Sequence, residues 1–240
     1  MTSERRFAST HSAFWNAVTP MSERFIRRLN PRPLRFAYEV ETLSDSSSRS
    51  LIAEIGFEIF SNHVENGIVK SIPPSEEHIE ISIARARTRL YGHIGDLSSQ
   101  SSLTATDLHE AMGIGRNLWS YCFINQLPLI ELRPRFKGCG IISACEGDIS
   151  SEATLFEVKA VSRGLGIADI RQVITYLALQ FAAGLPVFKS IVFINPRRGV
   201  SFEIDVAEMS NEISGTEVYD LLDDIVKYIS DLSSALSGRQ

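Results

Sequence analysis

The chain has 240 residues, 44% of them hydrophobic, and a formal net charge of −5 at pH 7, which suits one large domain or two small ones with a buried core. It contains no apolar run near the ~20 residues of a membrane helix and no signal-peptide pattern, so we expect a soluble protein. Its three cysteines lack the spacing of a metal site or a disulfide framework, which indicates a reducing, cytoplasmic setting.

The first 125 residues predict a mainly helical region. Helical patterning over 14–29 is interrupted at Pro20 and ends at the Asn-Pro-Arg-Pro run of residues 30–33. A short strand is expected over 36–43. Longer helices are then expected over 51–63, 76–95 and 105–123. We expect this region, residues 1–125, to bind substrate or a partner.

Residues 126–240 predict an α/β domain. Its expected elements are a strand over 127–136 broken by Pro134, apolar strands over 141–145 and 155–161, a helix over 168–183, a strand over 188–194 and an acidic helix over 218–236. A short polar break joins the two apolar strands, which indicates an antiparallel hairpin. The following strand–helix–strand passage implies a parallel crossover. Together they predict a mixed central sheet with flanking helices.

Charged residues interrupt the second strand of this hairpin. Because side chains alternate between the faces of a strand, Glu157 and Lys159 share one face and Phe156 and Val158 the other. Burying a charge costs several kcal/mol unless it is paired or holds a metal. The pattern therefore indicates chemistry, although Glu157 and Lys159 could also lie on the solvated face of an open sheet.

Two acidic residues end the first strand. A turn centred near residues 151–152 places Glu146 opposite Glu157. Asp148 then falls opposite Leu155, and neighbouring side chains of a hairpin lie within roughly 5–8 Å of each other. Asp148 and Glu157 could thus hold one hard cation such as Mg²⁺, which prefers oxygen ligands. The alternative is that Asp148 is a turn residue only.

The helix expected over 168–183 carries a polar stripe beside its apolar one. Asp169, Gln172 and Tyr176 recur at positions i, i+3 and i+7. Packed against the sheet, this helix could aim Gln172 and Tyr176 at whatever Glu157 and Lys159 bind. The two residues could also be ordinary boundary residues of an amphipathic helix.

The order Gly147-Asp148, Glu157-Val158-Lys159, Gln172-x-x-x-Tyr176 resembles the PD-(D/E)XK nuclease superfamily, which has the restriction-endonuclease-like fold, and its RecB-like branch in particular. The resemblance covers residues 127–200. It implies that Asp148 and Glu157 bind metal together with the Val158 carbonyl, and that Lys159 positions the attacking water. It also implies that Gln172 and Tyr176 support the catalytic site.

The resemblance implies an enzyme: a cytoplasmic, Mg²⁺- or Mn²⁺-dependent nuclease, a hydrolase that cuts phosphodiester bonds of DNA rather than RNA, whether as an endonuclease or from strand ends. Similar small nucleases act in bacterial restriction, antiviral defence and repair. The alternative is a non-catalytic nucleic-acid-binding or assembly subunit on the same fold, working as a homo-oligomer or within a larger complex. Hydrolysis of a small phosphorylated or glycosidic substrate fits less well, since it leaves Lys159 without a role.

Two features depart from the superfamily's pattern. Gly147 stands where a proline usually precedes the aspartate, and Asp148 lies unusually near Glu157 in sequence. Glu146 could therefore share or take over the role of Asp148.

Further candidates lie outside these motifs. Such nucleases often place another glutamate on an earlier helix, and Glu54, Glu58 and Glu110 qualify, although each could instead lie on an exposed helix surface. Arg197 and Arg198, after the strand expected over 188–194, are expected to contact substrate phosphates. A solvated basic loop is the alternative.

Overall fold

The computed structural model describes residues 1–42, 44, 48–67, 74–91 and 103–237. It is an α/β structure built on a mixed six-stranded sheet with strand order β1-β8-β7-β6-β5-β2. β6 and β7 are parallel, and the other neighbouring pairs of this sheet are antiparallel. Its strands are β1 (Leu34–Arg35), β2 (Glu131–Leu132), β5 (Ile149–Ser151), β6 (Thr154–Val158), β7 (Ser190–Asn195) and β8 (Val200–Asp205). A separate small sheet pairs β3 (Arg135–Phe136) with β4 (Cys145–Glu146).

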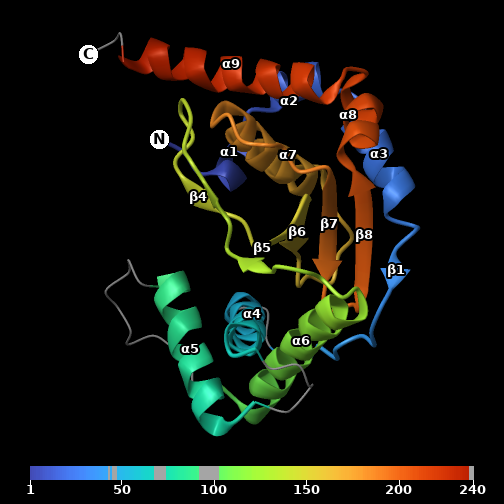
Figure 1. Ribbon diagram of the computed structural model, residues 1–240, viewed down its shortest axis with the longest axis vertical. Helices are drawn as coiled ribbons and strands as arrows, with labels where there is room; N and C mark the ends of the chain where they lie inside the picture. The colour runs from blue at the N-terminus through green and yellow to red at the C-terminus, as the bar shows by residue number, and fades with distance from the viewer. Residues whose placement is uncertain (43, 45–47, 68–73, 92–102, 238–240) are drawn as a thin grey trace.

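Two groups of helices cover the two faces of the large sheet (Figure 1). Side chains that alternate along the strands divide between them: Leu155 and Ile191 join one hydrophobic cluster, Phe156 and Val192 the other. The first cluster includes residues of α1 (Glu4–Thr10), α2 (Ser12–Val18), α3 (Ser22–Leu29), α7 (Ile167–Ala182), α8 (Val206–Ser214) and α9 (Val218–Ser237). The second includes residues of α4 (Arg49–Glu65), α5 (Glu76–Tyr91) and α6 (Ala105–Ile124).

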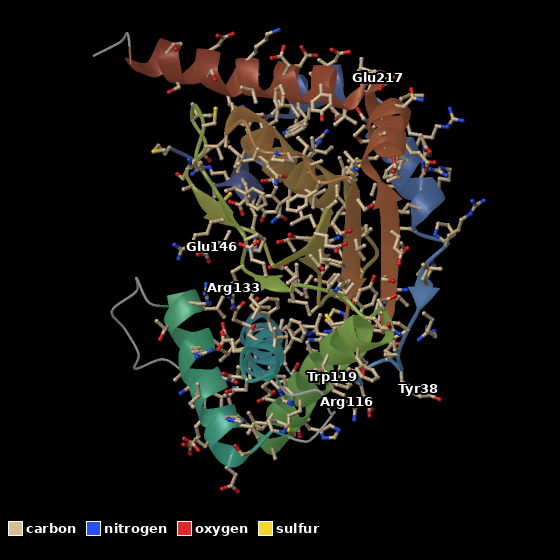
Figure 2. All side chains as sticks on the ribbon, in the orientation of Figure 1. Tyr38, Arg116, Trp119, Arg133, Glu146 and Glu217 are labelled. Atoms are coloured by element: carbon tan, nitrogen blue, oxygen red, sulfur yellow. The ribbon has the colours of Figure 1, made fainter. Side chains whose placement is uncertain are left out.

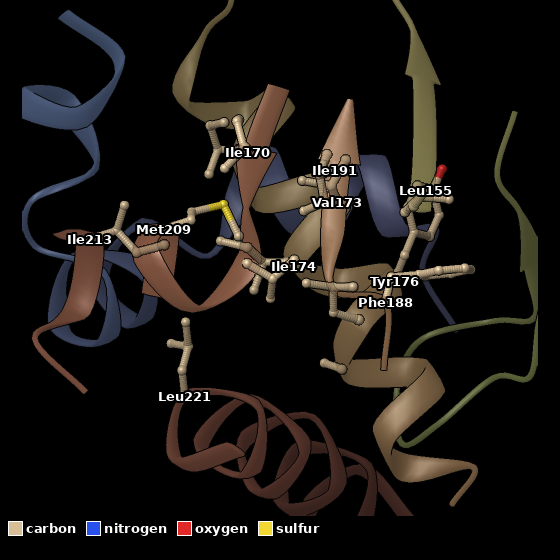
Figure 3. Packing of buried hydrophobic residues seen from close by; sticks show 14 of the residues in the cluster. Leu155, Ile170, Val173, Ile174, Tyr176, Phe188, Ile191, Met209, Ile213 and Leu221 are labelled. Carbon is tan, nitrogen blue, oxygen red and sulfur yellow. The ribbon is translucent and has the colours of Figure 1, made fainter. Parts of the chain in front are cut away.

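The apolar stripe of α7 anchors this helix in the first cluster. Ile170, Val173 and Ile174 recur at helical spacing and are fully buried. Figure 3 shows them between Ile191 of β7 and Met209 of α8. Burial of each such side chain contributes roughly 1.5–3 kcal/mol. The packing fixes the rotation of α7 about its axis, and with it the direction of the polar stripe.

In the second cluster, α4 and α6 pack closely because glycines lie where the two helices meet. A Cβ on Gly56 would lie 2.6 Å from Cγ2 of Ile114, and one on Gly115 would lie 2.8 Å from the carbonyl oxygen of Gly56. Glycine weakens a helix interior by about 1 kcal/mol relative to alanine. Close packing is therefore the reason for glycine at these positions, and it gives the sheet a tight second layer.

The predicted helices agree well with the structure. The helix expected over 51–63 is α4, that over 105–123 is α6, and that over 168–183 is α7. The helix expected over 76–95 corresponds to α5, except that residues 92–95 lie outside the described residues. These helices are the elements whose apolar residues recur with a clear helical period.

The strands agree less well. The strand expected over 36–43 is wrong for its described residues, because 36–42 form no strand and β1 precedes them, pairing with β8. Pro134 does divide the strand expected over 127–136, since β2 and β3 belong to different sheets. β8 was not predicted, because Glu203 and Asp205 obscure the apolar alternation of Val200, Phe202 and Ile204, and α8, which follows it, was not predicted either.

Segments from both sides of residue 125 share the two hydrophobic clusters. Phe7 and Trp15 pack with residues of α7, and Ile149 packs with residues of α4 and α6. The division of the chain into 1–125 and 126–240 stays a prediction. Among the helices described, none combines the length and apolarity that crossing a membrane requires.

Candidate functional site

The register of the β5–β6 hairpin determines which acidic residues meet. Ile149 pairs with Phe156, whereas the sequence predicts Asp148 opposite Leu155. The predicted register is therefore wrong by two residues. The strand predicted over 141–145 is also wrong, because only Cys145 of that range lies in a strand, β4, and the partner of β6 is β5. Because side chains alternate with a period of two, the two-residue shift in register leaves every side chain on its predicted face. Extending the observed register by one residue brings Asp148, rather than Glu146, level with Glu157.

A chain of hydrogen bonds runs from β6 to α7. Lys159 Nζ donates to Glu157 Oε1 and to Gln172 Oε1, at 2.8 Å each. Gln172 Nε2 donates to the Tyr176 hydroxyl at 2.8 Å, and that hydroxyl donates to the Glu146 carbonyl at 3.3 Å. Glu157 is 0% exposed, so the alternative of a solvated sheet face is wrong. The structure thus brings together Glu157 and Lys159 of the strand motif with Gln172 and Tyr176 of the helix motif.

Asp148 lies at the same end of the hairpin. Its Oδ2 accepts a hydrogen bond from the Val158 main-chain N–H at 2.6 Å, and its carbonyl accepts one from the Arg133 N–H at 2.9 Å. Burial and then the negative charge of Glu157 raise the pKa of Asp148 from its ordinary 3.8 to about 7. Asp148 is therefore bonded across the hairpin to β6, which a residue serving only a turn would not be.

The donor atoms suit a hard divalent cation. Glu157 Oε2 is buried and has no hydrogen-bond partner among the residues described. Asp148 carries a second carboxylate close enough to be affected by it. No cluster of three or more histidine, cysteine or acidic side chains with metal-ligand geometry occurs in the described part of the chain. The fit rests instead on two carboxylates and a main-chain carbonyl at Val158, a donor set that Mg²⁺ completes with water.

Asp169 and Arg5 join this site although neither motif includes them. Asp169 lies 3.7 Å from Lys159 Nζ, and its carboxylate accepts hydrogen bonds from Arg163 and from the Gly166 N–H. Burial acts to raise the pKa of Asp169, but these bonds outweigh it and lower the pKa. Burial acts to lower the pKa of Arg5, yet nearby negative charge, first that of Glu157, raises it.

A distant residue braces the loop between β6 and α7. Asn30, which follows α3, donates to the Leu165 carbonyl and accepts from the Leu165 N–H, at 2.9 Å in both cases. A Cβ on Gly164 would lie 2.8 Å from Asn30 Oδ1, so a larger residue here would displace the Asn30 side chain that holds the loop. Asn195 holds the start of the loop by donating to the Val161 carbonyl at 2.7 Å. The loop that follows Lys159 is therefore anchored at both ends.

The carboxylate of Glu146 turns away from the site. It pairs with Arg89 at 3.2 Å and Arg135 at 3.3 Å, and Figure 2 shows Glu146 beside α5, near Arg133. It therefore does not share the position of Asp148. Glu58, only 3% exposed, pairs with Arg133, Arg89 and Arg85, so the alternative of an exposed helix surface is wrong for this residue.

The other two candidates on early helices are also engaged. Glu54 pairs with Arg133 at 2.8 Å and is partly buried. Glu110 is 1% exposed and pairs with Arg197, which is itself 2% exposed, so an exposed surface is wrong for Glu110 too. Arg197 Nε also donates to the Ala160 carbonyl at 3.1 Å, directly after Lys159.

We expect Glu110→Gln to lower the free energy of unfolding by about 1.5–3 kcal/mol, because the buried guanidinium of Arg197 would lose its charged partner. Urea unfolding of the variant beside wild type measures this. Glu208→Gln, an exposed glutamate of α8, is the matched control and should change little. Equal urea midpoints for Glu110→Gln and Glu208→Gln would contradict a stabilising role of the buried Glu110–Arg197 pair.

The phosphate contacts predicted for Arg197 and Arg198 stay predictions. Arg198 donates its main-chain N–H to Asn195 Oδ1 at 3.1 Å.

The site as a whole places the carboxylates of Asp148 and Glu157, the ammonium of Lys159 and the amide of Gln172 at one end of β5 and β6. This arrangement suits hydrolysis assisted by a divalent cation. No protein-family model, no curated protein and no solved structure matches this chain.

Proposed function

We propose that the protein is a metal-dependent phosphodiesterase of the PD-(D/E)XK type that hydrolyses nucleic acid. The observation that carries the proposal is the buried carboxylate of Glu157, with one oxygen paired to Lys159 and the other without a hydrogen-bond partner among the residues described. Leaving a buried charge partly unpaired is costly, and a cation shared with Asp148 would offset that cost. DNA as the substrate, and a role in bacterial restriction, defence or repair, rest on the resemblance alone.

The residues have distinct roles in this proposal. A Mg²⁺ or Mn²⁺ ion held by Asp148, Glu157 and the Val158 carbonyl would supply an activated water and neutralise charge on the phosphate. Lys159 adds positive charge where negative charge develops during attack. Gln172 accepts a hydrogen bond from Lys159 and so keeps its ammonium group beside the carboxylates.

A cleavage assay tests the proposal. We expect Mg²⁺- or Mn²⁺-dependent cutting of labelled linear DNA, circular DNA or RNA, and a loss of about 10²-fold in Lys159→Ala, because the ammonium would no longer offset developing charge. Lys189→Ala, an exposed lysine before β7, is the matched control and should cut like wild type.

Three outcomes would count against the proposal. Cutting that survives Lys159→Ala would place the activity elsewhere. Cutting that persists in EDTA would exclude the metal. Nucleic-acid binding without any cutting by the wild type would favour the alternative of a non-catalytic subunit.

A further inference from the structure

A cleft of about 630 Å³ opens beside Lys159, and a third of its lining residues are cations. Five of its lining residues are positively charged, and Asp169 is the one acidic residue among those described there. The cations come from segments far apart in sequence: Arg5 on α1, Arg49 at the start of α4, Lys159 and Arg163 beside β6, and Arg197 after β7. Lys159, Arg163 and Arg197 pair with Glu157, Asp169 and Glu110, so the positive charge that the cleft offers to a ligand comes chiefly from Arg5 and Arg49, in a chain whose net charge is −5.

One cation of the cleft wall is incompletely paired inside the protein. Arg197 is 2% exposed, and its Nη2 has no hydrogen-bond partner among the residues described. A buried guanidinium nitrogen without an acceptor is costly, and an anion in the cleft would provide one. Arg49 and Ser50 begin α4, where main-chain N–H groups and the helix dipole also favour an anion.

The cleft has few groups that could recognise a base. The described lining contains no aromatic side chain on which a base could stack. Gln172 already bonds Lys159 and Tyr176, and Asp169 already bonds Arg163 and Gly166. The remaining polar side chains are cations and hydroxyls, which are the groups that contact phosphates.

We propose that this cleft binds the phosphodiester backbone of the substrate next to the bond that is cut, with Arg5 and Arg49 as phosphate contacts, and that it does so without reading base sequence. The inference rests on the proposed function and adds where and how the substrate is held. It also explains how an acidic protein could bind a polyanion, since the cations gather at one place. Arg5 and Arg49 are exposed, so replacing either should leave the fold intact.

Binding in EDTA, where metal-dependent cutting cannot occur, tests the cleft by itself. The probes are two labelled 30-nucleotide single strands of unrelated sequence and a duplex of one of them, titrated at several salt concentrations. We expect Arg5→Gln and Arg49→Gln each to weaken binding by about 5–10-fold, and to reduce the slope of log Kd against log salt concentration by about 1. Both single strands should bind equally well.

Two arginines outside the cleft lining serve as matched controls. Arg6 is the exposed neighbour of Arg5 on α1, and Arg116 is exposed on α6 (Figure 2). Arg6→Gln and Arg116→Gln should bind like wild type. Equal losses of affinity in the two controls would contradict the proposal that the cleft binds the nucleic acid. An unchanged affinity in the Arg5→Gln/Arg49→Gln double variant would contradict it as well. A preference of more than tenfold between the two single strands would overturn backbone-only recognition.

The cleft and the hydrolase can fail separately. If neither the wild type nor any variant cuts, but the cleft variants bind more weakly, the binding role of the cleft is supported and the proposed hydrolase activity is wrong. If the wild type cuts in a Lys159-dependent way, but the double variant binds and cuts as well as the wild type, the hydrolase activity is supported and the binding role of the cleft is wrong.

Discussion

Replacing Glu157 by glutamine is expected to reduce metal-dependent cleavage by about 10³-fold and to abolish metal binding, while the protein still folds. Glutamine keeps an oxygen that can accept the hydrogen bond from Lys159, so the link to α7 survives. It removes the buried negative charge whose Oε2 has no partner among the described residues. The metal would then have Asp148 as its one remaining carboxylate ligand, and hard cations bind mainly to such charged oxygens.

Two measurements check this result. Cleavage rates with Mn²⁺ report the loss of activity, and the midpoint of thermal unfolding with and without Mn²⁺ reports metal binding, since a ligand of the native state alone raises that midpoint. Glu203→Gln, an exposed glutamate on β8, is the matched control and should keep both the activity and the metal-induced rise. If Glu157→Gln still gains thermal stability from Mn²⁺, the carboxylates of the hairpin do not form the metal site.

The parts of the site that were predictable depend on short periodic patterns. The alternation along β6 places Glu157 and Lys159 on the face covered by α7, and the helical spacing of α7 places Gln172 above them. Each pattern spans fewer than 20 residues, so a single sequence contains it in full. The error of two residues in the predicted hairpin register preserves the faces, but it puts Glu146 rather than Asp148 opposite Glu157.

The turn and the long-range contacts were not predictable in the same way. Glu152 begins the two-residue turn with φ 49°, a left-handed conformation that glycine and asparagine favour, so its identity does not indicate a turn. Arg5 and Asn30 reach the site only through the packing of α1 and α3 with residues of α7. Glu110 meets Arg197 across 87 positions of sequence, and no local pattern indicates such a pair.

Replacing Asp148 by asparagine is expected to stabilise the metal-free protein at alkaline pH. The native carboxyl holds its proton up to about pH 7, whereas the unfolded chain releases it near the ordinary 3.8. Between these values the native state binds more protons than the unfolded state, so the free energy of unfolding falls as pH rises. The penalty therefore grows between pH 5 and pH 8 and is on the order of a few kcal/mol at the alkaline end. Asparagine has no charge and escapes it, while its amide oxygen can still accept the N–H of Val158.

Urea unfolding in EDTA from pH 5 to pH 8 measures this effect as a difference between proteins, so other titrating groups cancel. Asp231→Asn, an exposed carboxyl on α9, is the matched control and should follow the wild type. Mg²⁺ should stabilise the wild type more at pH 8 than at pH 5, because a metal binds the ionised carboxylate, and it should not stabilise Asp148→Asn. Parallel pH curves for wild type and Asp148→Asn would mean that this carboxyl ionises normally. The opposition between Asp148 and Glu157, which makes the pair a site for a cation, would then be absent.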